Sequence, residues 1–361
     1  MLEQTVSLIA HLLLWGILWA FFCNALYGLE SRENEVHFVT TPDGWRIALS
    51  RYRQQGERCA QYPVLLCHGL GSSRFGFDLG AAPSLAMHLA RDGFDVWSLE
   101  LRGHGRSERP RIVSQRRFGW SFDDYLTSDL PAAIDRVKAV TGAQQLHVIG
   151  HSMGGMLLLC HSSLHGTDIR SLTALGASLD FSDSGSDFAR LLKCKAFAQL
   201  LPAIPVGWLS FMLSPLTGRI RNPFEGFIMW FSNVAPVVTR HLYANTFCTV
   251  PLPVLLQLST AFEAGGLRKC DSEVRYLDLT SHLSAPALLL VGDRDRQCPP
   301  AACARTYEHL SQHSGTHQMV TFGRDAGQAD HYGHFDLLIG KRAEHEVFPT
   351  IEAWLVQHDA E

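Results

Sequence analysis

Short apolar runs alternate with longer amphipathic segments along most of the chain. The apolar runs have the length and the flanking turn residues of buried strands, and they lie at residues 64–68, 94–101, 146–149, 172–176, 287–291 and 319–322. Two further runs, at 36–40 and 45–51, flank a Pro-Asp-Gly turn and predict a β-hairpin. Helical periodicity is found at 81–91, 123–140 and 347–357. Strands that alternate with helices predict crossover units, and hence a mostly parallel central sheet flanked by helices.

The helix expected at 123–140 has signals at both ends. Asp123 is a plausible N-cap, because a short polar side chain can accept from the free N–H groups of the first turn. Gly142 lies just past the expected C-terminus. Between about residues 182 and 283 the alternation stops, and the chain is helical in pattern, aromatic and interrupted by prolines. We expect this stretch to be a helical insertion with its own small core that caps the sheet edge.

The N-terminal segment is uniformly apolar. Residues 5–29 contain no Asp, Glu, Lys or Arg, and about 20 apolar residues suffice for a helix to cross a bilayer. No basic residue precedes the run, which favours an uncleaved transmembrane helix over a signal peptide or an interfacial helix. Arginines follow the run, and by the positive-inside rule they place the remainder of the chain in the cytoplasm. The prediction is a single-pass anchor at 1–34 and a globular domain at 35–361.

Composition narrows the classes of function. The 361 residues carry 31 Lys and Arg against 35 Asp and Glu, with no basic run, which argues against nucleic acid as the main partner. The nine cysteines are scattered, without a C-x-x-C pair or a metal-ligand spacing, so neither a disulfide framework nor a zinc ribbon is expected. Reduced cysteines are typical of a cytosolic domain.

A glycine-flanked serine is the strongest chemical signal. The strand at 146–149 leads into Gly150-His151-Ser152-Met153-Gly154, which has the G-x-S-x-G form of a nucleophile elbow. In such a turn the serine adopts a strained backbone conformation, and a side chain at either flanking glycine would collide with the crossing strand and helix. Ser152 is therefore the candidate nucleophile.

A serine hydroxyl needs a base, and the base needs an acid that orients it. Asp293 and Asp295 follow the strand at 287–291, which places both at the same sheet edge as Ser152. His331 and His334 lie on the loop after the strand at 319–322. The chain order Ser, Asp, His suits this sheet topology. The spacing alone does not decide between the two aspartates or between the two histidines.

The loop His68-Gly69-Leu70-Gly71 directly follows the strand that begins at residue 64. Its glycines let backbone N–H groups approach a ligand without obstruction by a Cβ. The start of the helix after Ser152 leaves further N–H groups free. We expect the N–H groups of Leu70 and Met153 to stabilise an oxyanion.

Together these motifs resemble the α/β-hydrolase superfamily, and within it the lipase, lysophospholipase and monoacylglycerol-lipase-like serine hydrolases. The loop at 68–71 and the elbow at 150–155 are similar to theirs. The run at 101–107 is similar to the family's R-G-x-G-x-S loop, although Glu100 stands where Asp is usual. The G-x-x-D turn at 292–295 points to Asp295 as the acid, and the histidine loop at 332–336 points to His334 as the base. The resemblance covers about residues 36–355, apart from most of the insertion.

The resemblance implies an α/β-hydrolase fold and a serine esterase or lipase that needs no cofactor and no metal. Ser152, His334 and Asp295 would form its catalytic triad and cleave a carboxylic ester through an acyl-serine intermediate. The apolar insertion and the N-terminal anchor favour a lipid or acylglycerol ester, with an acyl chain held by the insertion. The fold by itself does not select a substrate, because one fold hosts many chemistries.

Three alternatives are weighed against this interpretation. Residues 331–336 also read H-x-x-x-x-D, similar to a motif of acyltransferase-like relatives, and acyl transfer shares the acyl-serine intermediate. A zinc site on His331, His334, Asp330 and Asp336 would need a further ligand cluster that the sequence lacks. A non-catalytic binding protein of this fold would have a disrupted triad, and all three candidate residues are present.

Overall fold

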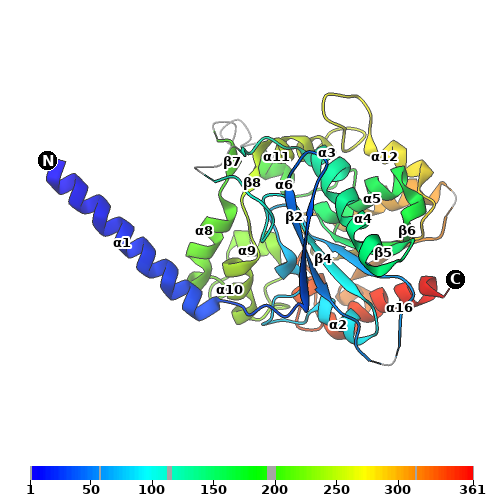
Figure 1. Ribbon diagram of the computed structural model, residues 1–361, viewed down its shortest axis with the longest axis horizontal. Helices are drawn as coiled ribbons and strands as arrows, with labels where there is room; N and C mark the ends of the chain where they lie inside the picture. Colours follow the sequence, from blue (N-terminus) through cyan, green and yellow to red (C-terminus); the bar gives the residue numbers. More distant parts are fainter. Residues whose placement is uncertain (1, 57, 112–115, 193–200, 314, 361) are drawn as a thin grey trace.

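The computed structural model describes residues 2–56, 58–111, 116–192, 201–313 and 315–360. Its central sheet has eight strands in the order β1-β2-β4-β3-β5-β6-β9-β10 (Figure 1). β1 and β2 form the predicted hairpin, and β2 also pairs antiparallel with β4. The other neighbouring strands pair in parallel, which confirms the predicted mostly parallel sheet. The bounds are β1 (Glu35–Thr40), β2 (Arg46–Tyr52), β3 (Val64–Cys67), β4 (Val96–Glu100), β5 (Leu146–His151), β6 (Ile169–Leu175), β9 (Ala287–Gly292) and β10 (His317–Phe322).

Helices cover both faces of the sheet, and each face has its own core. In β3, Leu65 and Cys67 join the core on one face, whereas Val64 and Leu66 join the core on the other, because successive strand residues point to opposite sides. The first core is covered by α4 (Leu130–Thr141), α5 (Met153–Leu164) and α13 (Pro300–Ser311). The second core is covered by α2 (Leu85–Arg91), α16 (Phe348–Asp359) and the short helices α14 (Asp336–Ile339) and α15 (Ala343–Glu346).

The start of the helix expected at 123–140 differs from the prediction. Ser121, not Asp123, is the N-cap of α3 (Phe122–Asp124), and it forms a capping box with Asp124. A π-helical turn at 125–129 then connects α3 to α4, which ends at Gly142 with the expected left-handed conformation. The Asp123 carboxylate instead accepts from the Tyr276 hydroxyl at 2.7 Å and from the insertion's backbone. Asp123 is used for a long-range contact, and a serine two residues earlier caps the helix.

The described part of the insertion at 182–283 is mostly helical, and it also contains a two-stranded ribbon that the sequence pattern does not predict. In Figure 1 it lies over one end of the sheet. We call this stretch the cap. Its elements are α6 (Phe188–Leu192), β7 (Ala203–Ile204), α8 (Val206–Leu213), α9 (Pro223–Ile228), α10 (Pro236–Asn245), β8 (Val250–Pro251), α11 (Leu252–Ser259) and α12 (Tyr276–Leu279).

A long helix, α1 (Leu2–Tyr27), occupies the apolar N-terminal segment for which we predict a transmembrane anchor. It projects from the body of the molecule, and its C-terminal part packs against α8 and α10 (Figure 1). Trp19 Nε1 donates to the Met212 carbonyl at 2.9 Å, and Asn245 Nδ2 donates to the Tyr27 carbonyl at 2.8 Å. Across the described ranges, we find no helix that combines the length and the apolar character needed to cross a membrane.

Candidate active site

Ser152 lies in the turn between β5 and α5, at the edge of the sheet where the parallel strands end. Its backbone angles are φ 55° and ψ −124°, a strained conformation for a residue with a side chain. The Ser152 N–H donates to the Leu175 carbonyl of the neighbouring strand at 2.8 Å, which holds the turn against β6. The side chain is half-buried, so the turn presents it at the surface of the sheet edge.

The two glycines of the elbow are required by the close approach of backbone to backbone. A Cβ on Gly154 would lie 2.1 Å from the Cys67 carbonyl oxygen at the end of β3. A Cβ on Gly150 would lie 2.4 Å from the Gly155 nitrogen. Both distances are far below van der Waals contact, so any side chain would push α5 away from the sheet and displace Ser152.

The structure contains two separate histidine–aspartate pairs on the acid and histidine loops. His334 Nδ1 lies 2.7 Å from Asp295 Oδ2, and both side chains are buried. His331 Nδ1 is paired with Asp293 instead, and that pair is only partly buried. Each aspartate that the spacing left open therefore has its own histidine. The pairing agrees with the combination of Asp295 and His334 that the family resemblance favours.

His334 and Asp295 adjoin the serine turn. A Cβ on Gly176, the residue after β6, would lie 3.0 Å from His334 Nδ1 and 3.1 Å from Asp295 Oδ2. The His151 and His334 rings are in contact, with centroids 4.6 Å apart and an interplanar angle of 48°, and His151 Nε2 lies 3.1 Å from the His334 carbonyl oxygen. His334 is thus packed against the residue next to Ser152.

The hydrogen bonds of this pair determine which nitrogen is free. Asp295 Oδ1 accepts from the N–H groups of Gln297 and Cys298, both at 2.8 Å, so the carboxylate is fixed by its own loop. Its other oxygen accepts from His334 Nδ1, which selects the tautomer with the proton on that nitrogen. His334 Nε2 is buried and has no hydrogen-bond partner among the described residues. A buried imidazole nitrogen with a lone pair is the arrangement that a general base requires.

The loop that we expect to stabilise an oxyanion lies against the serine. A Cβ on Gly69 would lie 2.9 Å from the Ser152 Cβ, so the backbone of this loop adjoins Ser152. Met153 is the first residue of α5, and its N–H therefore has no acceptor within the helix. Leu70 follows Gly69 on the same loop and is half-buried. Both expected donors are close in the chain to the Ser152–Gly69 contact.

His68 orients this loop, a role that the sequence pattern does not reveal. His68 Nδ1 donates to the Gly69 carbonyl at 2.9 Å, and Nε2 accepts from the Leu101 N–H at 3.2 Å. This assignment requires a neutral ring. Burial lowers the pKa of His68 to about 4, which keeps the ring neutral at physiological pH.

The R-G-x-G-x-S loop is held in place by buried polar contacts. Arg102 is buried, and its Nε donates to Asp129 at 2.7 Å while its other nitrogens reach Asp43 in the hairpin turn. Glu100 is fully buried, and its carboxylate accepts from the Arg106 N–H at 3.0 Å. A Cβ on Gly105 would overlap this carboxylate, so the longer Glu100 side chain occupies the space that glycine leaves.

The cap is hydrogen-bonded to the histidine loop and to the loop at 68–71, for which we expect a role in stabilising an oxyanion. On the histidine loop, Phe335 N–H donates to the Ile228 carbonyl at 3.0 Å, and the Trp230 N–H donates to both Asp336 oxygens at 3.1 Å. On the oxyanion loop, the Gly71 carbonyl accepts from the Cys248 N–H at 2.7 Å. Asp336, the last residue of the H-x-x-x-x-D pattern, therefore faces the cap.

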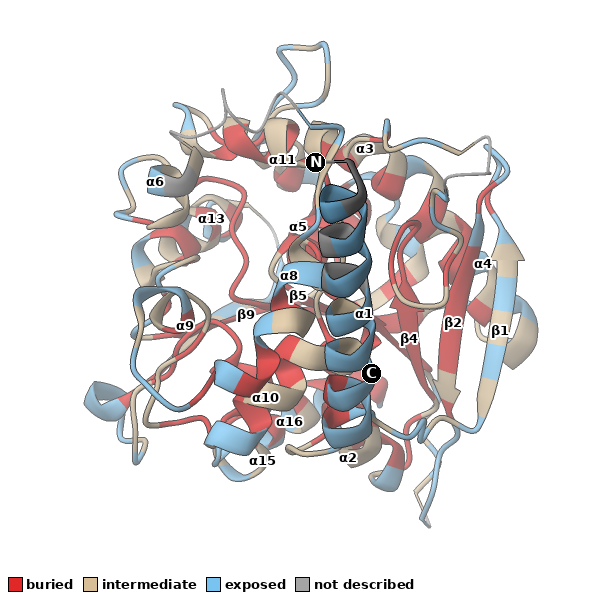
Figure 2. Ribbon diagram, turned by 90° about the vertical axis from the view of Figure 1, so that its left-hand side faces the viewer, coloured by how far each residue is buried: buried red, intermediate tan, exposed pale blue. Residues whose placement is uncertain are grey.

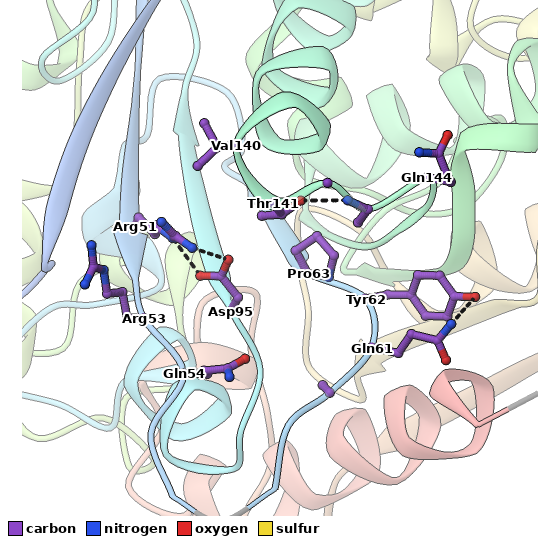
Figure 3. Close-up of a pocket in the computed structure, with 13 residues that line it drawn as sticks. Arg51, Arg53, Gln54, Gln61, Tyr62, Pro63, Asp95, Val140, Thr141 and Gln144 are labelled. Atoms are coloured by element: carbon purple, nitrogen blue, oxygen red, sulfur yellow. Dashed lines mark hydrogen bonds and ion pairs between the residues drawn. The ribbon is translucent and has the colours of Figure 1, made fainter.

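A hollow of about 780 Å³ lies elsewhere on the molecule (Figure 3). It is lined by residues such as Pro63, Asp95 and Gly142, which precede β3, β4 and β5. The strands begin at this edge, whereas Ser152 follows the end of β5. Sites of open parallel sheets form where the strands end, so this hollow is not a candidate for the chemistry of Ser152.

Comparisons with known proteins agree with this architecture. The family model of the α/β hydrolase fold matches residues 62–202. The chain is an α/β-hydrolase-fold protein. Lipase 1 of Drosophila melanogaster is 41% identical over 134 residues, which are 36% of this chain and 29% of the fly protein. The chain therefore aligns with less than a third of the length of that relative.

Two further proteins align with more of this chain. The poly(3-hydroxyalkanoate) polymerase subunit PhaC of Haloferax mediterranei is 21% identical over 330 residues, 86% of this chain and 62% of that protein. The solved structure of a membrane phospholipase A, described as a bacterial virulence factor, has a TM-score of 0.57 and 17% identity and covers 100% of both chains. At this identity the likeness shows the shared fold alone.

Proposed function

We propose that this protein is a serine hydrolase that cleaves carboxylic esters. The observation that carries the proposal is the buried His334–Asp295 pair, whose hydrogen bond leaves His334 Nε2 free beside the strained turn of Ser152. The match to the α/β hydrolase fold and the similarity to a lipase support the same reaction class.

In the proposed reaction, Ser152 Oγ attacks the ester carbonyl carbon while His334 Nε2 takes the hydroxyl proton. The N–H groups of Leu70 and Met153 stabilise the negative charge on the carbonyl oxygen of the tetrahedral intermediate. His334 then gives its proton to the leaving alkoxide, and an alcohol departs from the acyl-serine. The same nitrogen deprotonates a water molecule, which attacks the acyl carbon, and the carboxylic acid is released as Ser152 regains its proton.

A fluorophosphonate probe tests the nucleophile, because such probes react covalently with an activated serine. Ser152→Ala is expected to abolish labelling of the purified protein, since no other hydroxyl would be paired with His334. Ser163→Ala is the matched control, because that hydroxyl bonds the Leu159 carbonyl at the far end of α5. Equal labelling of the two variants would overturn the assignment.

The proposed substrate is the ester of a lipid or acylglycerol. This choice is supported by the similarity to Lipase 1 of Drosophila melanogaster and by the apolar side chains of the cap. We expect long-chain acyl esters to be cleaved with a higher kcat/KM than short-chain esters of the same alcohol. The measurement is hydrolysis of a p-nitrophenyl ester series from acetate to palmitate, and an exclusive preference for acetate would contradict the proposal.

The proposed location is a membrane, with α1 as an uncleaved anchor and the catalytic domain on the cytoplasmic side. The apolar N-terminal segment and the arginines that follow it support this orientation. The fold likeness to a protein described as a membrane phospholipase A is compatible with it. Membrane fractionation with protease protection tests both parts: the protein should sediment with membranes at alkaline pH, and its domain should be digested only from the cytoplasmic side.

Acyl transfer is the second candidate, because PhaC aligns with most of this chain. Transfer and hydrolysis differ only in whether water or another nucleophile resolves the acyl-serine. Incubation of an acyl ester with glycerol or a hydroxyacyl acceptor separates them. Free fatty acid as the main product supports hydrolysis, and acylated acceptor as the main product supports transfer.

A further inference from the structure

Six large apolar side chains are exposed together on the cap. They come from α8 and from the segment that leads into α9, and we call them the cap face: Trp208, Leu209, Leu213, Leu216, Ile220 and Phe224. Ile220 is 77% exposed and Phe224 is 76% exposed, close to the exposure of a side chain in an unfolded chain. Apolar groups at this exposure, gathered on neighbouring elements, mark a surface that is covered in use.

The long helix α1 leaves the molecule from the same side. Figure 2 shows α1, α8, α9 and α10 together on one face, with α1 largely exposed. Eight large apolar side chains in the described part of α1 have exposed fractions between 48% and 77%: Val6, Leu14, Trp15, Ile17, Leu18, Phe21, Phe22 and Leu26. The exposed apolar side chains of α1 and of the cap face therefore lie on the same side of the molecule, and α1 packs directly against α8.

The orientation of α1 on this surface is fixed by its contacts. Trp19 bonds the Met212 carbonyl at the end of α8, and Cys23 is fully buried against the cap. The residues after α1 are also tied down, because Arg32 pairs with Asp78 and Glu33 pairs with Arg106. A flexible tether would leave the domain free to turn, whereas these contacts hold the cap face beside the emerging helix.

The charges on the cap face have one sign. Arg219 and Arg221 flank Ile220, both are exposed, and neither has an ion pair to a described carboxylate. Among residues 201–245 the only acidic residue is Glu225. It is buried and accepts from the Gly218 N–H at 3.0 Å. The Arg221 guanidinium lies over the Phe231 ring, 5.3 Å from its centroid. The exposed apolar side chains are thus bordered by two exposed guanidinium groups that have no described carboxylate partner.

We propose that the cap face, together with α1, docks on an anionic lipid bilayer. Apolar side chains enter the acyl boundary, and Arg219 and Arg221 bind the lipid phosphates, as guanidinium groups do at charged membrane surfaces. A second copy of the chain is a poorer occupant. A two-fold pairing of this face would bring its arginines against each other without an acidic partner. The inference adds a second, charge-selective contact to the proposed membrane anchor, and it does not depend on ester hydrolysis.

Photo-cross-linking of the full-length protein tests the proposal at a single position. Phe224 is replaced by the photoreactive p-benzoylphenylalanine, and Phe38, an exposed phenylalanine on the edge strand β1, is replaced in the same way as the control. Each protein is irradiated in two kinds of vesicle. One contains phosphatidylcholine alone, and the other contains phosphatidylcholine with about 30% of the anionic lipid phosphatidylglycerol. We expect a lipid adduct at Phe224 and none at Phe38, with several-fold more adduct in the anionic vesicles.

The charge contribution is tested by a second pair of variants in the same Phe224 background. Arg219→Gln with Arg221→Gln should lower the adduct in anionic vesicles to the yield in phosphatidylcholine. Arg91→Gln with Arg275→Gln removes the same charge away from the cap face and should leave the yield unchanged. A protein–protein adduct at Phe224, an equal lipid yield at Phe38, or a yield insensitive to anionic lipid would each overturn the proposal. Fluorophosphonate labelling is read separately, so failure of the proposed hydrolase activity would be recognised independently.

Discussion

The carboxylate of Asp336 accepts the backbone N–H of Trp230 through both of its oxygens at 3.1 Å. This contact joins the loop that carries His334 to a residue of the cap 106 positions earlier in the chain. Asp336 is fully buried, and burial raises the pKa of its carboxyl to about 8. A side chain that lies outside the His334–Asp295 pair therefore holds the histidine loop in place.

Replacing Asp336 tests this holding role. Asp336→Ala leaves the Trp230 N–H buried without its acceptor, which typically costs about 1–3 kcal/mol of stability. We also expect kcat to fall by about tenfold or more, with KM changed less, because His334 would lose its fixed position. Asp336→Asn keeps an acceptor oxygen and is expected to retain most of the activity. Urea unfolding and ester kinetics measure the two effects, and equal kcat for the alanine variant and the unmodified protein would refute the positioning role.

The raised pKa of Asp336 predicts a direction for the pH dependence of stability. An ordinary aspartate loses its proton near pH 3.9, whereas the folded protein keeps this proton until about pH 8. Between these values the folded state binds more protons than the unfolded state, so the stabilising contribution of Asp336 is fully present below pH 4 and falls as pH rises towards 8, by at most about 1.4 kcal/mol per pH unit. Asp336→Asn should flatten this contribution. Denaturant midpoints at pH 5 and pH 8, for both proteins, provide the comparison.

The buried histidines predict the opposite dependence at acidic pH. His161 is almost fully buried, both ring nitrogens lack a described partner, and burial lowers its pKa to about 4. The unfolded chain binds the proton near pH 6.5, so the stability contribution of neutral His161 is present above that pH and is lost as pH falls towards 4. His161→Leu should reduce the loss of stability between pH 7 and pH 4 by up to about 3 kcal/mol. An unchanged acid midpoint in thermal unfolding would contradict this prediction.

The two histidine–aspartate pairs make a matched set of variants. His334→Ala and Asp295→Asn are expected to lower kcat by about three to four orders of magnitude, since they remove the base or its orientation. His331→Ala and Asp293→Asn change the same residue types in the neighbouring pair and should lower kcat less than tenfold. The kcat values of the four variants are measured with one ester. A larger loss of kcat in the His331 and Asp293 variants would contradict the assignment of His334 as the base.

The same glycine-to-alanine substitution should have different effects on activity and stability at Gly154, in the elbow, and at Gly119, outside it. Gly154→Ala places a Cβ 2.1 Å from the Cys67 carbonyl, so α5 must move away from β3. We expect loss of activity and at least several kcal/mol of destabilisation, in the range of severe overpacking. Gly119→Ala adds a Cβ that meets no atom within 4 Å and should leave kcat and the unfolding midpoint nearly unchanged.

Local patterns predicted the mostly parallel sheet because short stretches of sequence contain the apolar strands and the turns that bound them. The order of the strands in the sheet depends on long-range pairing and was not predicted. They also predicted that Ser152, the two aspartates and the two histidines would lie at one sheet edge. The choice between His331 and His334 is different, because each histidine has an aspartate at nearly the same separation along the chain. Packing against His151 and Gly176 distinguishes them, and neither contact follows from spacing.

Long-range polar contacts explain what the patterns missed. Asp123 has the residue type and position of an N-cap, but its carboxylate is occupied by Tyr276, and Ser121 takes over the cap. The sequence places Asp336 in an H-x-x-x-x-D pattern and in a possible zinc cluster, but it does not predict the contact with the cap, because the partner of Asp336 is a backbone N–H. A side chain whose partner is a distant main-chain group leaves no pairwise signal in one sequence.

The helix α10 lies between the two cap segments that bond the catalytic loops. Before it, Ile228 and Trp230 bond the histidine loop, and after it, Cys248 bonds Gly71 of the oxyanion loop. Swinging this part of the cap outward as a lid would break these bonds and disturb proton transfer and oxyanion stabilisation together. We therefore expect this part of the cap to stay in place when a substrate reaches Ser152, because the same hydrogen bonds hold both loops next to Ser152.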